Sequence, residues 1–160
     1  MEITEPTVEL IAITPDAEKV IESAGRTCYL SFERMDDGTA GDFIRKSIIR
    51  GHLSILEHSC ATFRIKGASR AFTHQLVRHR MASFSQQSQR YVREEEFDFI
   101  TPPSISGNDE AHRIYVECME KCREAYSALR KLSILKEDAR FVLPNALESE
   151  IVFTAYFREL

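Results

Sequence analysis

The sequence changes its hydrophobic period in the middle of the chain. Residues 60–66 alternate between apolar and polar side chains, which predicts a half-buried strand. Gly67 breaks the alternation, and residues 69–79 then repeat apolar side chains at helical spacing, with Phe72 and Leu76 on one stripe. A strand followed at once by a helix, in a chain with further elements of both kinds, predicts an α+β fold.

The same periodicity predicts the other elements. We expect a strand over residues 8–14 and helices over residues 16–26, 42–50, 109–132 and 137–142. Residues 38–41 and 80–93 are expected to be loops and Pro102-Pro103 a linker, whereas residues 151–157 fit a strand or a helix equally well. The predicted caps are Asp16 and Asn108 at helix starts and Gly51 at a helix end. The buried stripe predicted for the longest helix is Ile114, Cys118, Cys122, Ala125 and Leu129.

Length and composition predict an ordinary cytoplasmic protein. A chain of 160 residues is expected to form a single domain, residues 1–160, with a core that needs no disulfides. No apolar run reaches the roughly 18 residues of a membrane span, and the N-terminus does not read as a signal peptide. The four cysteines form no CxxC pair, so we expect Cys118 and Cys122 to be buried thiols rather than a metal or redox pair.

A basic stretch interrupts this acidic chain. Residues 61–93 contain seven lysines and arginines and no aspartate or glutamate, whereas the rest of the chain carries 14 cations against 25 anions. Its densest part, residues 78–91, places serines and glutamines between arginines. Guanidinium groups suit phosphate, and the neutral side chains can bind uncharged polar groups. The stretch therefore predicts a site for a polar, phosphorylated small molecule.

Several common site patterns are missing from the sequence. It has no GxGxxG fingerprint, no P-loop and no nucleophile elbow. It also has no HExxH motif or paired histidine–carboxylate spacing, so no catalytic metal is expected. A bound nucleotide would therefore be held by side chains rather than by a glycine-rich loop.

Three motifs resemble one enzyme family. Arg78-His79-Arg80, followed by Ser88 after seven residues, matches the RHR-x7-S signature of the flavin-dependent thymidylate synthases. The resemblance covers about residues 20–160. The two other segments that are similar to that family are Gly51-His52-x-Ser54-x-Leu56-Glu57-His58 and Arg140-x-Val142-Leu143-Pro144.

The resemblance implies a fold, a reaction and an assembly. The fold would be an antiparallel sheet flanked by helices. The reaction would convert dUMP to dTMP, with bound FAD, NADPH as reductant and methylenetetrahydrofolate as carbon donor. The assembly would be a homotetramer with shared active sites, without nucleic-acid or membrane partners.

The resemblance also assigns residues. The implied catalytic set is His52, Ser88 and Arg90, with Ser88 a ligand-binding hydroxyl rather than a nucleophile because no general base is spaced for it. The implied flavin contacts are His52, Ser54, Glu57, Arg78, His79, Arg80, Gln86 and Arg158. The implied dUMP contacts are Gln75, Arg78, Gln86, Gln87, Ser88, Gln89, Arg90 and Arg140.

Other interpretations of the chain stay open. Tyr156-Phe157-Arg158 stands where the family usually has Asn-Ala-Arg, and the sequence ends before a further helical segment that the family usually has. We therefore expect either a piece of such an enzyme or a shortened, non-catalytic homologue that binds flavin or nucleotide. An RNA-binding module is a third interpretation, although the net charge of −4 argues against it. Taken alone, Glu57 would be a surface charge or a partner for one of the arginines, and Arg140 a cation at a helix end.

Overall fold

The computed structural model describes residues 2–3, 5–92 and 94–160, so Arg93 of the basic stretch lies outside the described residues. The chain divides into two compact units. Unit 1 comprises Met1–Val8, Ile65–His79 and Ser85–Ile151, and unit 2 comprises Glu9–Arg64, Arg80–Phe84 and Val152–Leu160.

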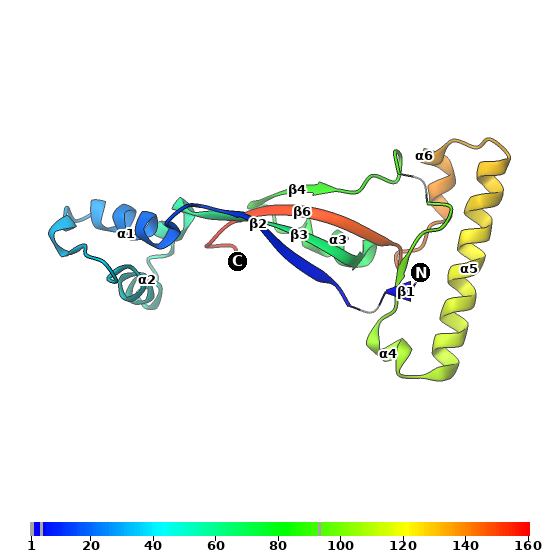
Figure 1. Ribbon diagram of the computed structural model, residues 1–160, viewed down its shortest axis with the longest axis horizontal. Coiled ribbons are helices and arrows are strands. Elements are labelled where there is room, and N and C mark those ends of the chain that lie inside the picture. Colours follow the sequence, from blue (N-terminus) through cyan, green and yellow to red (C-terminus); the bar gives the residue numbers. More distant parts are fainter. Residues whose placement is uncertain (1, 4, 93) are drawn as a thin grey trace. The chain divides into compact units, whose positions relative to one another are not determined.

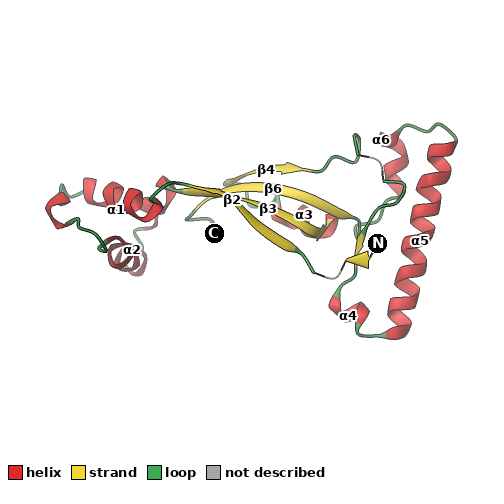
Figure 2. Ribbon diagram, viewed as in Figure 1, coloured by secondary structure: helices red, strands yellow, loops and turns green. Residues whose placement is uncertain are grey.

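Figure 1 follows the elements along the chain, and Figure 2 separates helices from strands. The strands are β1 (Glu2–Ile3), β2 (Thr7–Ile13), β3 (Cys60–Ser69), β4 (Ala82–Gln86), β5 (Phe99–Ile100) and β6 (Glu148–Tyr156). The α-helices are α1 (Ala17–Thr27), α2 (Ala40–Ile49), α3 (Arg70–Leu76), α4 (Pro103–Ser106), α5 (Asp109–Lys131) and α6 (Lys136–Ala139). Short 3-10 helices are η1 (Phe32–Arg34), η2 (Leu53–His58) and η3 (Arg140–Val142). No helix in this described part of the chain is long and apolar enough to cross a bilayer.

Strands β2, β3, β6 and β4 lie in that order in one sheet. In unit 2 the neighbouring strands are tied by side chains, because the hydroxyls of Thr62 and Thr154 lie 2.8 Å apart. The ring of Phe153 on β6 stacks on Phe63 of β3 and on Phe84 of β4, with centroids 5.3 and 6.4 Å apart. Such cross-strand aromatic pairs stabilise a sheet. The predicted α+β fold, with an antiparallel sheet and helices, is confirmed.

The core of unit 1 forms around α5. Asn108 begins this helix as predicted, since its side chain accepts a hydrogen bond from the Ala111 N–H at 3.0 Å. Met119 and Tyr126 of α5 are buried, and Met119 belongs to the cluster that also contains Phe97, Phe99 and Leu147. Helices α4 and α6 lie near the two ends of α5 (Figure 1).

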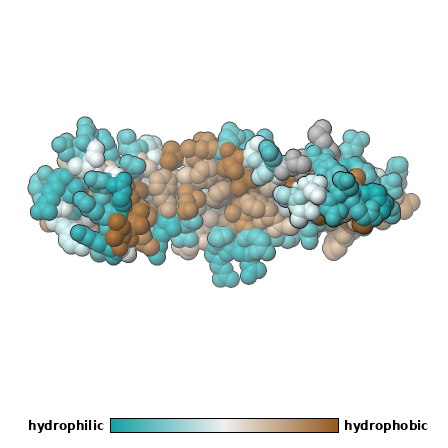
Figure 3. Space-filling view, turned by 90° about the horizontal axis from the view of Figure 1, so that it is seen from below, coloured by the Kyte–Doolittle hydropathy of each residue, from teal (hydrophilic) through white to brown (hydrophobic). Residues whose placement is uncertain are grey.

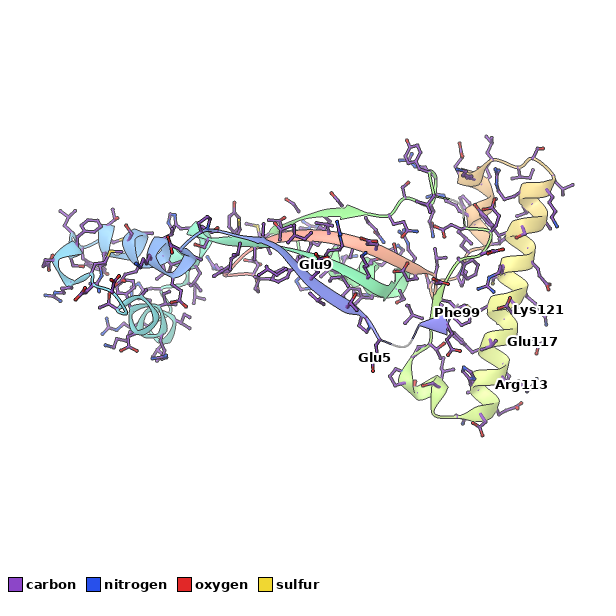
Figure 4. All side chains as sticks on the ribbon, in the orientation of Figure 1. Glu5, Glu9, Phe99, Arg113, Glu117 and Lys121 are labelled. Carbon is purple, nitrogen blue, oxygen red and sulfur yellow. The ribbon has the colours of Figure 1, made fainter. Side chains whose placement is uncertain are left out.

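The predicted buried stripe of α5 was wrong at Ile114, Cys118 and Ala125, whereas Cys122 does pack against the core cluster. Ile114 is 55% exposed and Cys118 is exposed, whereas Met119 and Tyr126 face the core. Apolar side chains occupy two adjacent stripes of this helix, so spacing alone could not say which of them is buried. The charged side chains Arg113, Glu117 and Lys121 point away from the core (Figure 4) and are paired, with Lys121 Nζ 2.7 Å from a Glu117 oxygen.

The core of unit 2 lies between α1, α2 and η2. Ile21, Ile55 and Leu56 are its buried residues, and Phe43 and Phe157 pack against them.

The two helix ends predicted in unit 2 had different outcomes, and the cap predicted at Asp16 was wrong in its chemistry. Asp16 precedes α1 as expected, but its side chain makes no capping hydrogen bond and its φ is +49°. The predicted end of α2 at Gly51 is confirmed by geometry: Gly51 N–H donates to Ile48 O, and His52 N–H to Ser47 O, both at 2.9 Å. This pattern is a Schellman motif.

Four more expectations met a different outcome in the described chain. The stretch 80–93, expected to be a loop, contains β4, and Pro103 begins α4 instead of lying in a linker. Strand β3 continues through Gly67, whose φ of +68° only glycine adopts without cost. Phe72, expected on the buried stripe of α3, is 43% exposed, and Thr73 is buried instead. Residues 151–157, left undecided, form most of β6.

The end of α2 gives a stability prediction. Gly51 has a φ of +77° and open space around it, so Gly51→Ala should destabilise by about 1 kcal/mol through backbone strain alone. Gly41 lies inside α2 with equally open space, so Gly41→Ala should stabilise by roughly 0.5–1 kcal/mol. Urea unfolding of both variants measures the difference. Equal effects of the two substitutions would contradict the role assigned to Gly51.

Candidate functional site

The residues implied by the resemblance divide between the two units. Those in unit 1 lie on α3, in the turn that follows it, at the end of β4 and on η3. Those in unit 2 lie directly before η2 and on it, directly before β4, and after β6. Unit 1 holds Gln75, Arg78, His79, Gln86, Gln87, Ser88, Gln89, Arg90 and Arg140, and unit 2 holds His52, Ser54, Glu57, Arg80 and Arg158.

Gln86 is fixed by two buried hydroxyls. Its amide nitrogen donates to Thr73 Oγ1 at 2.6 Å and to Ser149 Oγ at 3.0 Å. Thr73 and Ser149 are buried, so neither hydroxyl can move far without losing packing. Both N–H groups of the amide are used in this way, and its carbonyl oxygen is left to accept a hydrogen bond from a ligand. Gln86 therefore presents an acceptor in a fixed direction.

Gln87 joins β4 to β6 and to a buried carboxylate. Its backbone N–H donates to Glu150 O at 2.9 Å, and its side-chain oxygen accepts from the Glu150 N–H at 3.3 Å. Its amide nitrogen donates to Glu94 Oε1 at 3.2 Å. Both ends of the Gln87 amide are thus bonded within unit 1, an arrangement that positions the segment following β4.

Ser88 starts a tight turn that carries Arg90. The Ser88 carbonyl accepts hydrogen bonds from the N–H groups of Tyr91 and Val92 at 3.1 and 3.0 Å. Its hydroxyl accepts from the Arg90 N–H at 3.3 Å. The exposed guanidinium of Arg90 lies over the ring of Tyr91, 5.7 Å from its centroid. The turn therefore sets a hydroxyl and a guanidinium two residues apart on a fixed backbone.

A cluster of exposed cations follows α3. Two turn hydrogen bonds, from Arg78 N–H to Gln75 O at 3.0 Å and from His79 N–H to Leu76 O at 3.1 Å, end the helix. Gln75, Arg78, His79 and Arg80 are all exposed. Within residues 2–3, 5–92 and 94–160, no carboxylate lies within ion-pair distance of Arg78, Arg80 or Arg90. These guanidinium groups remain available to an anionic ligand.

Arg140 lies on η3 beside another arginine. Its Nε donates to Glu137 O at 3.0 Å. The pKa of the Arg70 guanidinium is lowered, first by burial and then by the positive charge of Arg140. Two positive charges that lie near each other and are partly buried repel each other, and a bound anion would relieve that repulsion.

In unit 2 an open cleft of about 880 Å³ lies beside η2, and His52 and Ser54 line it. The backbone N–H of His52 is part of the Schellman motif that ends α2, so the end of that helix fixes the position of His52 in the lining of the cleft. Glu57 and Arg158 form an ion pair, which joins η2 to the residues after β6. The interpretation of Glu57 as a partner for an arginine is confirmed.

Sequence reasoning missed the residues that support these side chains. Thr73 and Ser149 hold Gln86, and Glu94 accepts from Gln87. Nothing in the spacing distinguishes a buried threonine from an exposed one, and Glu94 stands in an acidic run that reads as solvated. Glu94 is only 5% exposed. Burial raises the pKa of its carboxyl, and the Gln87 hydrogen bond opposes that rise.

Comparisons with known proteins agree with one another. Residues 9–160 match the family described as Thymidylate synthase complementing protein. The chain is 44% identical to the flavin-dependent thymidylate synthase of Geobacter sulfurreducens over 161 residues, which cover 96% of this chain and 69% of that protein. Thymidylate synthase X from Helicobacter pylori, solved with FAD and dUMP, has a TM-score of 0.81 and 27% identity, covering 97% of this chain and 80% of its own. The UMP/dUMP methylase PolB from Streptomyces cacaoi, bound with 5-Br dUMP, has a TM-score of 0.84 and 26% identity, covering 99% and 76%.

Glu94 gives a prediction about pH. When a carboxyl has a higher pKa in the folded chain than in the unfolded chain, the free energy of unfolding falls as pH rises through the interval between the two pKa values. Glu94→Gln is neutral at every pH and can still accept from Gln87. It should therefore melt at a higher temperature than the wild type at pH 8, with the difference vanishing below about pH 4.

The control for this experiment is the exposed neighbour Glu96. Glu96→Gln removes the same charge without removing a buried carboxyl. Thermal unfolding of the wild type and both variants across this pH range gives the comparison. A constant offset between Glu94→Gln and the wild type at every pH would contradict the role of burial at Glu94.

Proposed function

The chain belongs to the flavin-dependent thymidylate synthase family, and we propose that it is a methyltransferase that converts dUMP to dTMP with FAD as its cofactor. The observation that carries the proposal is the segment from Gln86 to Arg90, which contains Ser88 of the family signature and is held by hydrogen bonds within unit 1. When bound, the flavin supplies hydride chemistry that no side chain of the protein can perform. The chain itself binds and orients.

We assign dUMP to the residues around this segment. The carbonyl of Gln86 suits the N–H of a uracil ring, and the Ser88 hydroxyl can bond a sugar or phosphate oxygen. The guanidinium of Arg90 can donate a charge-assisted hydrogen bond to the phosphate, which strengthens dUMP binding. The remaining members of the proposed dUMP set are Gln75, Arg78, Gln87, Gln89 and Arg140. Of these, Gln87 makes its contacts inside unit 1, so it supports the segment and reaches dUMP only through its backbone.

The donor set also fits a flavin dinucleotide. A pyrophosphate needs cations that have no carboxylate partner, and Arg78 and Arg80 meet that condition among the described residues. His79 adds a ring donor beside them. We assign the unit 2 residues His52, Ser54, Glu57 and Arg158 to the flavin as well, with Arg158 held by Glu57. His52 would lie beside the flavin ring, as the resemblance implies, and Ser54 would be a further flavin contact.

We also propose NADPH as reductant and methylenetetrahydrofolate as carbon donor. The location would be cytoplasmic, and residues 1–160 would act as one domain.

The proposed assembly is a homotetramer with shared active sites. Exposed apolar side chains on the strands support it. Figure 3 shows apolar surface over the strands, and Leu10 and Ile13 of β2 are 51% and 48% exposed. A β2 edge covered by a second copy would remove this surface from water.

The test of the function is turnover. Purified protein is reconstituted with FAD and assayed for tritium release from 5-tritiated dUMP with NADPH and methylenetetrahydrofolate. We expect release that depends on all four components. Binding of FAD and dUMP without any release would support the non-catalytic homologue instead, and failure to bind either would contradict the proposal.

Arg90 tests the phosphate contact separately from turnover. Arg90→Ala should weaken dUMP by roughly 1.5–3 kcal/mol, because a hydrogen bond to a charged group is lost. Deoxyuridine has no phosphate, so its binding should change little. Calorimetry with both ligands decides the point, and Arg113→Ala on the outer face of α5 serves as the control. Equal weakening of the two ligands would mean that Arg90 only supports the turn.

A further inference from the structure

The cleft of unit 2 has walls that are fixed before any ligand arrives. Buried Glu22 on α1 accepts hydrogen bonds from Arg26 Nε at 2.7 Å and from the Thr39 hydroxyl at 2.9 Å. Arg26 in turn lies over the ring of Phe43, 4.9 Å from its centroid. Phe43 packs so closely on Gly25 that a Cβ there would lie 2.6 Å from the ring. These contacts join α1, α2 and the segment between them.

The charges that line this cleft do not cancel. Its two carboxylates are already used, since Glu33 lies 3.4 Å from Arg34 and Asp42 lies 2.6 Å from Arg45. Lys46 and Arg50 also line it. In the described part of the chain, neither has a carboxylate within ion-pair distance.

Capping of α2 does not account for these two cations. Basic side chains at a helix end often bond the last carbonyls. Here the carbonyls of Lys46, Ser47 and Ile48 accept backbone N–H groups from the residues that follow, at 2.9 to 3.2 Å. The ammonium and guanidinium groups thus stay free beside a cleft whose apolar lining includes Phe43 and Ile55.

We propose that this cleft binds the anionic end of a co-substrate, meaning a group with two or more negative charges carried by carboxylates or phosphates. Lys46 and Arg50 hold the charges, and the apolar lining contacts the carbon frame. His52, which is assigned to the flavin, lines the same cleft, so a ligand held by Lys46 and Arg50 would have its other end close to the cofactor. A volume of about 880 Å³ is large enough for such a ligand. This inference rests on the proposed function, which supplies two candidates: the glutamyl carboxylates of methylenetetrahydrofolate and the phosphates of NADPH.

The chain contains its own reporter for this site. Cys28 is an exposed thiol that lines the cleft, and Cys118 is an exposed thiol on α5 of unit 1. A ligand in the cleft should slow alkylation of Cys28 and leave Cys118 unchanged. The protein is first saturated with FAD and dUMP under anaerobic conditions. Methylenetetrahydrofolate or NADPH is then added in separate arms, and iodoacetamide labelling of each cysteine is followed by mass spectrometry.

One of the two arms should slow Cys28 labelling about tenfold at roughly ten times the dissociation constant of that ligand. The arm that does so identifies the source of the charges. Lys46→Gln and Arg50→Gln should each weaken that ligand about tenfold, because each loses one charged contact. Their affinities for FAD and dUMP should stay at the wild-type values. Lys19→Gln on α1, which lies outside the cleft and pairs with Asp37, removes the same charge and should have no effect.

Three results would overturn the inference. If FAD and dUMP bind but neither co-substrate protects Cys28, the cleft is not their site and the proposed function still stands. If FAD alone protects Cys28 and the two variants weaken FAD, the cleft belongs to the cofactor. If the wild type binds neither FAD nor dUMP, the proposed function fails and this inference fails with it.

Discussion

The hydrogen bonds from Gln86 to Thr73 and Ser149 are the constraint on which the unit 1 site depends. They tie the end of β4 to α3 and to β6 at one point, through hydroxyls that are buried. Gln87 then repeats the connection to β6 through Glu150, and the turn at Ser88 starts from this fixed base. A polar network of this kind is costly when it is half satisfied, so each partner restricts the others. These hydrogen bonds therefore fix the direction of the Gln86 side-chain carbonyl and the position of Arg90.

Unit 2 uses a different device for a similar purpose. A single buried carboxylate, Glu22, holds a guanidinium and a hydroxyl and so fixes the walls of a cleft. Glu22 is buried together with an opposite charge, because the guanidinium of Arg26 lies 2.5 Å from one of its oxygens. Glu94 in unit 1 is buried without an ion pair in the described chain, and its raised pKa reflects that difference.

The elements that local rules specify were the ones the sequence predicted. Asn108 begins α5 and Gly51 ends α2 because each satisfies backbone groups within a few residues. The buried face of α5 depends on what packs against it, so the apolar stripe at Ile114 and Cys118 was misleading. Strand β4 was missed because its pairing with β6 joins residues more than 60 positions apart. The motifs predicted the family, whereas Thr73 and Ser149 carry no signature and could be found only in three dimensions.

The dUMP affinity of Thr73→Val tests most directly whether the Gln86 anchor organises the site. Valine keeps the shape of the buried threonine but cannot accept the Gln86 amide, so one N–H loses its partner. We expect dUMP to bind about 5- to 30-fold more weakly, which corresponds to roughly 1–2 kcal/mol for an unsatisfied donor. Thr62→Val, which removes a hydroxyl contact in unit 2, should leave dUMP affinity at the wild-type value. Wild-type dUMP affinity in folded Thr73→Val would contradict the claim that the Gln86 anchor organises the site.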